Sequence, residues 1–181
     1  MERAQDIADH AGSLIRINKD GSVPGDNPFI KDPNAKPEIY TYGNRNIQGI
    51  ASHPTTNQIW TIEHGPQGGD ELNLIRSGMN YGWPVITYGV NYNGTKITDI
   101  THKEGMEQPV WHWTPSIAVC GMKIYKGEEF GSWNGNILVT SLKFEYLERV
   151  VVNDRKMVER EIIYEPGSRV RDVEIDPLGN I

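Results

Sequence analysis

The sequence predicts an all-β protein, and three observations lead to this fold class. Glycine occurs 19 times and proline 11 times among the 181 residues, spread along the chain, which leaves little room for long helices. Short apolar or alternating runs recur between turn residues, as in antiparallel sheets. Two segments also repeat at a spacing that suits propeller blades. The length fits one domain, residues 1–181.

The individual elements follow in chain order. Residues 2–10 are the one stretch that predicts a short helix. Each run that predicts a strand is bounded by Gly, Asn, Asp or Pro; the runs are 13–17, 58–62, 122–125, 136–142, 147–152, 160–164 and 169–175. The alternation at the end of residues 63–75 also predicts a strand.

The repeated unit consists of an apolar pair, a Pro turn and an Asn close to Ile. It occurs as "GIASHPTTNQI" (49–59) and "DVEIDPLGNI" (172–181). The two prolines, Pro54 and Pro177, are 123 residues apart, which equals three periods of 41. Four-stranded propeller blades have about this length. A propeller and a sandwich both remain open from the repeat alone.

Composition excludes several classes of protein. The net charge is -6 and no basic run could follow a phosphate backbone, so we expect no nucleic-acid partner. The single cysteine, Cys120, excludes an internal disulfide and a cysteine zinc cluster. No apolar stretch is long enough for a membrane span, and the N-terminal residues lack a signal-peptide core.

The stretch "EHGPQGGDELNLI" (63–75) combines two glycine turns with the adjacent acids Asp70 and Glu71. Glycine permits close approach of a ligand, and carboxylates together with turned-out carbonyls suit a hard cation such as calcium. A tight surface loop is the alternative that the local composition favours.

Two arginines, Arg169 and Arg171, share one face of the strand predicted at 169–175 because side chains alternate along a strand. Two like charges side by side are unfavourable unless an anion lies between them. The two explanations are an anionic ligand and salt bridges to Asp172 or Glu174.

Other enzyme signatures are absent. The sequence has no G-x-S-x-G elbow, no phosphate-binding P-loop and no H-E-x-x-H motif. His64 follows Glu63 and could serve as a base or a metal ligand, although a lone histidine is more often structural.

Six ordered motifs together resemble the soluble aldose sugar dehydrogenase branch of the glucose/sorbosone dehydrogenase family, which uses pyrroloquinoline quinone. The resemblance runs from "AQDIADHAGSLIRINKDGSVPGDNPF" to the last residue. The motifs are "YGNRNIQGI", "EHGPQGGDELNLI", "GMNYGWPVITYG", "WHWTPSIA", "SLK" and "SRVRDV". What it implies is part of a six-bladed propeller, with about four blades present, that carries quinone and calcium at the mouth of its channel.

The resemblance also assigns residues. The carbonyls of Gly65 and Pro66 are expected to bind the calcium that holds the quinone, while Glu71 and Tyr81, with Asp70 nearby, match a second, structural calcium.

The groups expected to hold the carboxylates and oxygens of the quinone are Arg45, Asn46, Lys143, Arg169 and Arg171. A tricarboxylate ligand would explain the paired arginines. Trp113 matches an aromatic residue at the rim of the site, with packing between blades as its alternative role.

The implied reaction is oxidation of an aldose at C1, with hydride passing to the quinone. Arg45 is expected to stabilise the reduced cofactor electrostatically. The family's base histidine lies upstream of the matching segment, so the chain resembles an inactive C-terminal part of such an enzyme.

Two other functions remain as alternatives, a calcium-dependent lactonase-type propeller and a non-catalytic propeller that serves as a binding module. An incomplete propeller is expected to self-associate, because a blade face without its neighbour leaves apolar surface exposed. The family resemblance implies a periplasmic or secreted location, and the electron acceptor is unknown.

Overall fold

The computed structural model describes residues 1–181 and contains ten β-strands and two short 3-10 helices. In chain order they are η1 (Glu2–Gln5), β1 (Leu14–Ile15), β2 (Ile39–Thr41), β3 (Ile47–Ser52), β4 (Ile59–Glu63), β5 (Asp70–Ile75), β6 (Trp111–Trp113), β7 (Val119–Ile124), η2 (Gly131–Trp133), β8 (Ile137–Ser141), β9 (Leu147–Asn153) and β10 (Lys156–Tyr164). The all-β fold predicted from the sequence is confirmed.

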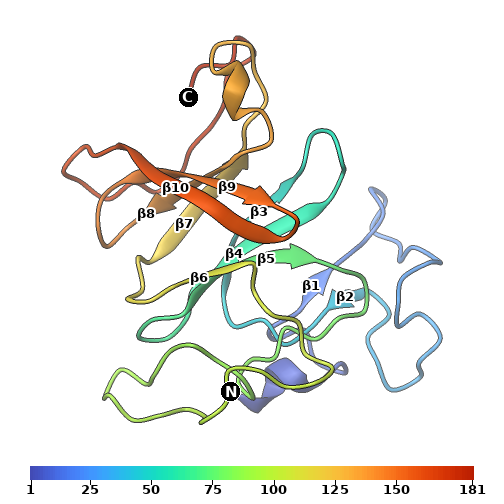
Figure 1. Ribbon diagram of the computed structural model, residues 1–181. Coiled ribbons are helices and arrows are strands. Elements are labelled where there is room, and N and C mark those ends of the chain that lie inside the picture. Colours follow the sequence, from blue (N-terminus) through green and yellow to red (C-terminus); the bar gives the residue numbers. More distant parts are fainter.

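The strands form two four-stranded antiparallel sheets and one two-stranded ladder. The first sheet has the order β3-β4-β5-β6, the second has the order β10-β9-β8-β7, and β1 pairs with β2. Both larger sheets are meanders of consecutive strands, as propeller blades are. They lie beside each other in Figure 1, with β3 of the first sheet next to β7 of the second.

The core lies between these two sheets. Thirteen buried side chains from β4 to β9 and the loops between them form one cluster, which includes Ile62, Leu72, Trp113, Val139 and Val150. Alternation explains its composition, because every second residue of a strand faces the neighbouring sheet. A smaller cluster around Tyr125 and Leu138 lies on the other face of the second sheet.

The strand expected at 169–175 does not form. This segment is extended and its backbone near Asp172 runs against Gly121 of β7, but no strand of the chain pairs with it. A strand is defined by its ladder, and an alternating pattern without a partner cannot make one. The turn predicted after it does form, since Asp176 N donates to Asn180 O at 2.9 Å.

The helix expected at 2–10 is also shorter than predicted, because only Glu2–Gln5 form a 3-10 turn. Asp6 already has extended dihedral angles, and its carboxylate accepts a hydrogen bond from Ala8 N. Asp9 accepts one from Ala11 N in the same way. Aspartate side chains that bind nearby backbone amides compete with helix formation.

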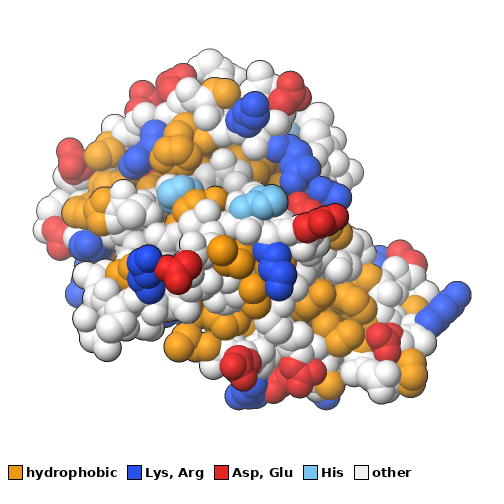
Figure 2. Space-filling model, turned by 60° about the horizontal axis from the view of Figure 1, so that its bottom comes forward, with side chains coloured by type: hydrophobic (Ala, Val, Ile, Leu, Met, Phe, Trp, Pro, Cys, Tyr) orange, Lys and Arg blue, Asp and Glu red, His pale blue; other side chains and the backbone are white.

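Figure 2 shows the side of the molecule that lies at the bottom of Figure 1. Acidic, basic and histidine side chains are interspersed there with hydrophobic surface, and neither sign of charge forms a continuous patch. The protein contains no helix with the length and apolar character of a membrane-crossing segment.

Candidate functional site

The topology places most of the predicted site residues at one edge of the two sheets. In an antiparallel meander, the starts of the first and third strands lie at the same edge as the ends of the second and fourth. Arg45 precedes β3, Gly65 follows β4, and Lys143 follows β8. The two sheets are joined at this edge by His64, which follows β4. Its Nε2 lies 2.5 Å from the carbonyl oxygen of Val119, at the start of β7.

The loop between β4 and β5 is a tight, buried turn. Gly65 and Pro66 are buried, yet neither of their carbonyl oxygens accepts a hydrogen bond. A Cβ on Gly65 would lie 2.2 Å from the carbonyl oxygens of both Gly68 and Gly69, so only glycine fits there. Unpaired buried carbonyls are rare and suggest a missing partner, such as a cation.

Asp70 holds this loop in place. Its fully buried carboxylate accepts hydrogen bonds from Gly65 N at 2.9 Å, from Ser116 Oγ at 2.8 Å and from Ala118 N at 2.8 Å. A fourth donor, Val119 N, lies 3.4 Å away. Asp70 therefore fixes the loop to the segment that leads into β7, and its oxygens already have protein partners.

Glu63 supports the turn on the other side. Its buried carboxylate accepts from Arg45 N at 2.5 Å, from Asn46 N at 3.2 Å and from Asn73 Nδ2 at 3.0 Å. Burial raises the pKa of Glu63 to about 7, although the hydrogen bonds from Arg45 and Asn46 and the charge of Arg45 act in the opposite direction. Glu63 thus fixes the backbone that presents Arg45 and Asn46.

A cavity of about 10 Å³ lies beneath the loop, with Glu63, Gly65, Glu71 and Tyr81 among its lining residues. This is about the space that one water molecule or ion needs. Burial, and then the neighbouring Glu63, raise the pKa of the Glu71 carboxyl well above its ordinary value. A bound cation would offset the repulsion between the carboxylates of Glu63 and Glu71.

Glu71 and Tyr81 are the residues expected at a second calcium, and only some of their atoms are free to bind a cation. The Tyr81 hydroxyl donates to Leu74 O at 2.7 Å and accepts from Arg76 N at 2.9 Å, so it is fully engaged. The Tyr81 carbonyl accepts no hydrogen bond, and of the Glu71 carboxylate only Oε2 has a partner, Asn73 Nδ2. No three His, Cys, Asp or Glu side chains gather in a metal-binding group.

Arg45 and Asn46 line a larger pocket of about 410 Å³ together with Pro66 and Trp83. The guanidinium carbon of Arg45 lies 5.2 Å from the centre of the Trp83 ring, and Nη1 donates to His64 O at 3.0 Å. The Nε of Arg45 is buried and has no partner. The pocket therefore has the guanidinium of Arg45, which these contacts hold in place, on one side and Pro66 of the Gly-Pro loop on another.

Lys143, Arg169 and Arg171 are exposed, and none of them forms an ion pair. The carboxylate of Asp172 instead accepts from Val173 N at 2.9 Å, and Glu174 pairs with Lys123 at 2.8 Å. The salt bridges that offered an alternative explanation of the paired arginines are not formed. Their charges remain available to an anionic ligand.

Trp113 is a buried residue of β6, the last strand of the first sheet. Its side chain is 2% exposed, and its indole Nε1 donates to Glu148 Oε1 at 2.8 Å. The ring belongs to the core between the two sheets. Its surroundings match the alternative role, packing between blades, and Trp113 is also among the residues that line a pocket of about 310 Å³.

Two supporting residues, Glu63 and Trp83, were not predicted from the sequence. Glu63 ends an otherwise apolar strand run, and an acid in such a place can signal a buried hydrogen-bonded carboxylate. Trp83 lies in "NYGWP", where no local signal indicates the distant Arg45 as its partner.

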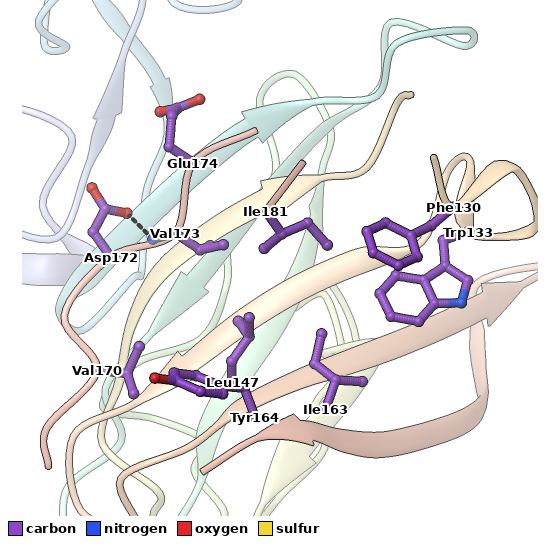
Figure 3. Close-up of a pocket in the computed structure, with 10 residues that line it drawn as sticks. All are labelled: Phe130, Trp133, Leu147, Ile163, Tyr164, Val170, Asp172, Val173, Glu174 and Ile181. Atoms are coloured by element: carbon purple, nitrogen blue, oxygen red, sulfur yellow. Dashed lines mark hydrogen bonds between the residues drawn. The ribbon is translucent and has the colours of Figure 1, made fainter. Parts of the chain in front are cut away.

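Another cavity, of about 580 Å³, lies elsewhere in the protein. Figure 3 shows its apolar wall of Phe130, Trp133, Leu147 and Ile163, and the side chains of Asp172 and Glu174 at its edge. It separates the second sheet from the C-terminal segment and has few convergent polar groups. Small-molecule sites need such groups to orient a ligand, so we do not place the functional site here.

Comparison with known proteins identifies the family. The family model described as Glucose / Sorbosone dehydrogenase matches residues 1–181. The aldose sugar dehydrogenase YliI of Escherichia coli (strain K12) is 43% identical over 179 residues, which cover 97% of this chain and 48% of that protein.

Solved structures agree with the observed fold. The soluble aldose sugar dehydrogenase from Escherichia coli in the apo-form matches with a TM-score of 0.92 and 42% identity, over 98% of this chain and 52% of that chain. The PQQ-bound form of aldose sugar dehydrogenase from Streptomyces coelicolor matches with a TM-score of 0.70 and 27% identity, over 93% and 44% of the two chains. These neighbours are propellers, and this chain spans about half their length.

Proposed function

This chain belongs to the glucose/sorbosone dehydrogenase family, and on that premise we propose that it forms the cofactor-binding part of a quinone-dependent aldose dehydrogenase. The observation that carries the proposal is the pair of buried, unpaired carbonyls of Gly65 and Pro66 beside the pocket of Arg45 and Asn46. A cation site and a positioned arginine in contact with one pocket suit an anionic cofactor.

Two calcium positions follow from the free oxygen atoms. The carbonyls of Gly65 and Pro66 would bind the calcium that faces the pocket. The free Oε1 of Glu71 and the carbonyl of Tyr81 would bind a second calcium in the small cavity. Calcium takes such mixed sets of carbonyl and carboxylate oxygens.

The cofactor would be held by charge. Asn46 would donate from its amide, and the unpaired cations of Lys143, Arg169 and Arg171 would face the carboxylates of pyrroloquinoline quinone. When bound, this group supplies a two-electron acceptor for oxidation of an aldose at C1. Arg45, fixed by Trp83 and His64, would place its positive charge where negative charge accumulates during the reaction.

Binding of the cofactor tests the role of the arginines. We expect Arg169→Ala and Arg171→Ala each to weaken quinone binding by about 1.5–3 kcal/mol, the usual contribution of a charge-assisted hydrogen bond. Binding would be followed by the absorbance of the quinone in calcium buffer. Arg155→Ala is the control, because Arg155 lies in the turn between β9 and β10, at the opposite edge of the sheet. Equal affinity in all four proteins would remove both arginines from the site.

Calcium binding is tested separately by thermal unfolding. A cation that binds only the folded protein stabilises it by mass action, by about 2.7 kcal/mol at a hundredfold excess over Kd. We expect the Tm to rise in millimolar calcium and to fall in chelator. An unchanged Tm would contradict a calcium site at Gly65 and Pro66.

We further propose that this chain does not oxidise sugars by itself. His64 is the histidine of the candidate site, and its Nε2 is already bound to the carbonyl of Val119. A general base contributes about 10²–10⁴-fold to a rate, so its absence would reduce turnover to near background. Dye reduction with glucose, calcium and quinone tests this, and substantial turnover that His64→Ala abolishes would contradict it.

Self-association is proposed for the apolar groove shown in Figure 3. Tyr164 and Ile181, which line the groove, are 59% and 42% exposed, and a contiguous exposed apolar surface favours association. Light scattering should give a mass above that of one chain, and a monomer at micromolar concentration would contradict this. The periplasmic or secreted location implied by the resemblance stays a prediction.

A further inference from the structure

A pocket of about 250 Å³ opens at the edge of the sheets opposite the candidate cofactor site. Its walls come from the turns between β3 and β4 and between β9 and β10, and from the strands β4, β5, β8 and β9. Both large sheets therefore contribute to it. The lining residues with polar side-chain groups are His53, Gln58, Trp60, Asp154 and Arg155. None of them is assigned to calcium or quinone above.

Two side chains near the turn between β3 and β4 have free donor groups. His53 Nδ1 accepts hydrogen bonds from Thr55 N and Thr56 N, both at 3.2 Å, so the proton of the neutral ring is on Nε2. Gln58 Oε1 accepts from Thr56 Oγ1 at 3.1 Å, which leaves the amide Nε2 as a donor. Because a metal-bound histidine normally donates from its other ring nitrogen, His53 is not arranged as a metal ligand.

Two further lining residues favour an occupied pocket. Gly135 has a φ of +87°, and a Cβ there would lie 3.0 Å from His53 Nε2, so any other residue would strain the turn and crowd this donor. Trp60 is 4% exposed, and its indole Nε1 is buried without a partner. A buried donor that the chain leaves unpaired requires another explanation, and a bound polar molecule is one.

The turn between β9 and β10 adds one charge of each sign. Arg155 Nη2 donates to Glu107 Oε2 at 3.1 Å, and its Nε and Nη1 make no hydrogen bond. Glu107 is shared with Arg76, whose Nη1 donates to the same oxygen at 3.3 Å, so one carboxylate balances two guanidinium groups. Asp154 forms no ion pair. The pocket thus combines several free donors with one carboxylate acceptor.

We propose that this pocket binds a small carboxylate with a neighbouring hydroxyl group, a 2-hydroxy acid such as lactate. Its carboxylate would accept from Arg155, His53 and Trp60, because an ionised acceptor makes the strongest hydrogen bonds with such donors. Its hydroxyl would donate to Asp154. The volume lies below the range for drug-sized ligands and suits a molecule this small. Binding there requires neither calcium nor quinone, so it does not depend on the proposed function.

The experiment measures the affinity for racemic lactate by ligand-observed NMR, in chelator and without quinone. We expect millimolar binding to the parent, about 10-fold weaker binding to Arg155→Ala and about 5-fold weaker binding to Trp60→Phe, which loses the indole N–H but keeps a large ring. Lys156→Ala is the matched control, because it removes a positive charge from the next residue, which does not line the pocket. Its affinity should equal that of the parent.

A second ligand tests the role of Asp154. Propionate is lactate without the hydroxyl, and we expect the parent to bind it about 5-fold more weakly than lactate. Asp154→Ala should bind the two acids equally, because the acceptor for the hydroxyl is gone. An unchanged preference for lactate in Asp154→Ala would overturn the proposal, as would the absence of lactate binding or parent-like affinity in Arg155→Ala or Trp60→Phe. Tighter binding of inorganic phosphate, or of the amino acid alanine with its ammonium group in place of the hydroxyl, would overturn it too.

Discussion

Glu63 makes the stability of this protein depend on pH in a way that a single substitution should remove. The ordinary pKa of the carboxyl is 4.5, and burial raises it to about 7 in the folded protein. Between these values the folded state holds a proton that the unfolded state has released. The free energy of unfolding contributed by Glu63 is therefore fully present below about pH 4.5 and is lost as the pH rises through about 7.

The size of the effect follows from that interval. At about 1.4 kcal/mol for each pKa unit, the shift from 4.5 to about 7 corresponds to roughly 3 kcal/mol. Glu63→Gln keeps an oxygen for the amides of Arg45 and Asn46 but cannot ionise. We expect it to be about 1 kcal/mol less stable than the parent at pH 5, through one weakened hydrogen bond, and about 2 kcal/mol more stable at pH 8.

The assay is urea unfolding at pH 5, 6, 7 and 8 in the presence of chelator, followed by tryptophan fluorescence. Titrating groups other than Glu71 are common to both proteins and largely cancel in the difference. Because Glu63 also raises the pKa of the Glu71 carboxyl, removing its charge lowers that pKa and adds to the same gain in stability at high pH. Glu104→Gln, at an exposed glutamate, is the control for removing one carboxylate. A difference between Glu63→Gln and the parent that is the same at pH 5 and pH 8 would refute the reasoning.

Two further substitutions test how the site is built. Gly65→Ala places a Cβ 2.2 Å from the carbonyl oxygens of Gly68 and Gly69. We therefore expect a loss of about 3 kcal/mol in the free energy of unfolding and no rise of Tm with calcium. A calcium response equal to that of the parent would argue against carbonyl ligands in this loop. Trp113→Phe leaves the buried Glu148 without its indole donor and creates a cavity, so we expect a loss of about 2–4 kcal/mol in urea unfolding. A change below about 0.5 kcal/mol would show that this hydrogen bond is unimportant for stability.

Much of the fold could be predicted because local patterns decided it. The apolar run at 58–62 became β4 and the run at 136–142 became β8, each with boundaries within one residue of the prediction. The three residues of β6 carry too short a pattern to detect, and their partners in β5 lie 39 to 43 positions earlier in the sequence. The segment 169–175 failed in the opposite way, since its alternation was clear but no strand of the chain pairs with it.

The candidate site shows the same division between local and distant causes. The glycines around Gly65 and the motif of Arg45 and Asn46 could be found by reading along the sequence. The hydrogen bonds of Asp70 to the segment leading into β7 could not be predicted in this way. Its partners Ser116 and Ala118 are more than 45 residues away in the sequence. The position of Trp113 was left open for the same reason, since burial depends on the packing of two sheets.

The carboxylate of Asp70 has a consequence for how the protein opens. It binds the amides of Gly65, in the first sheet's loop, and of Ala118, at the entrance to the second sheet. When one of these amides is released to solvent, the Asp70 carboxylate is held less firmly. Its hydrogen bond to the other amide then weakens. The two segments therefore belong to a single cooperative unit of local unfolding, and their amide hydrogens should exchange together. A ligand that orders the Gly-Pro loop would then also slow exchange at the start of β7, on a sheet that it does not touch.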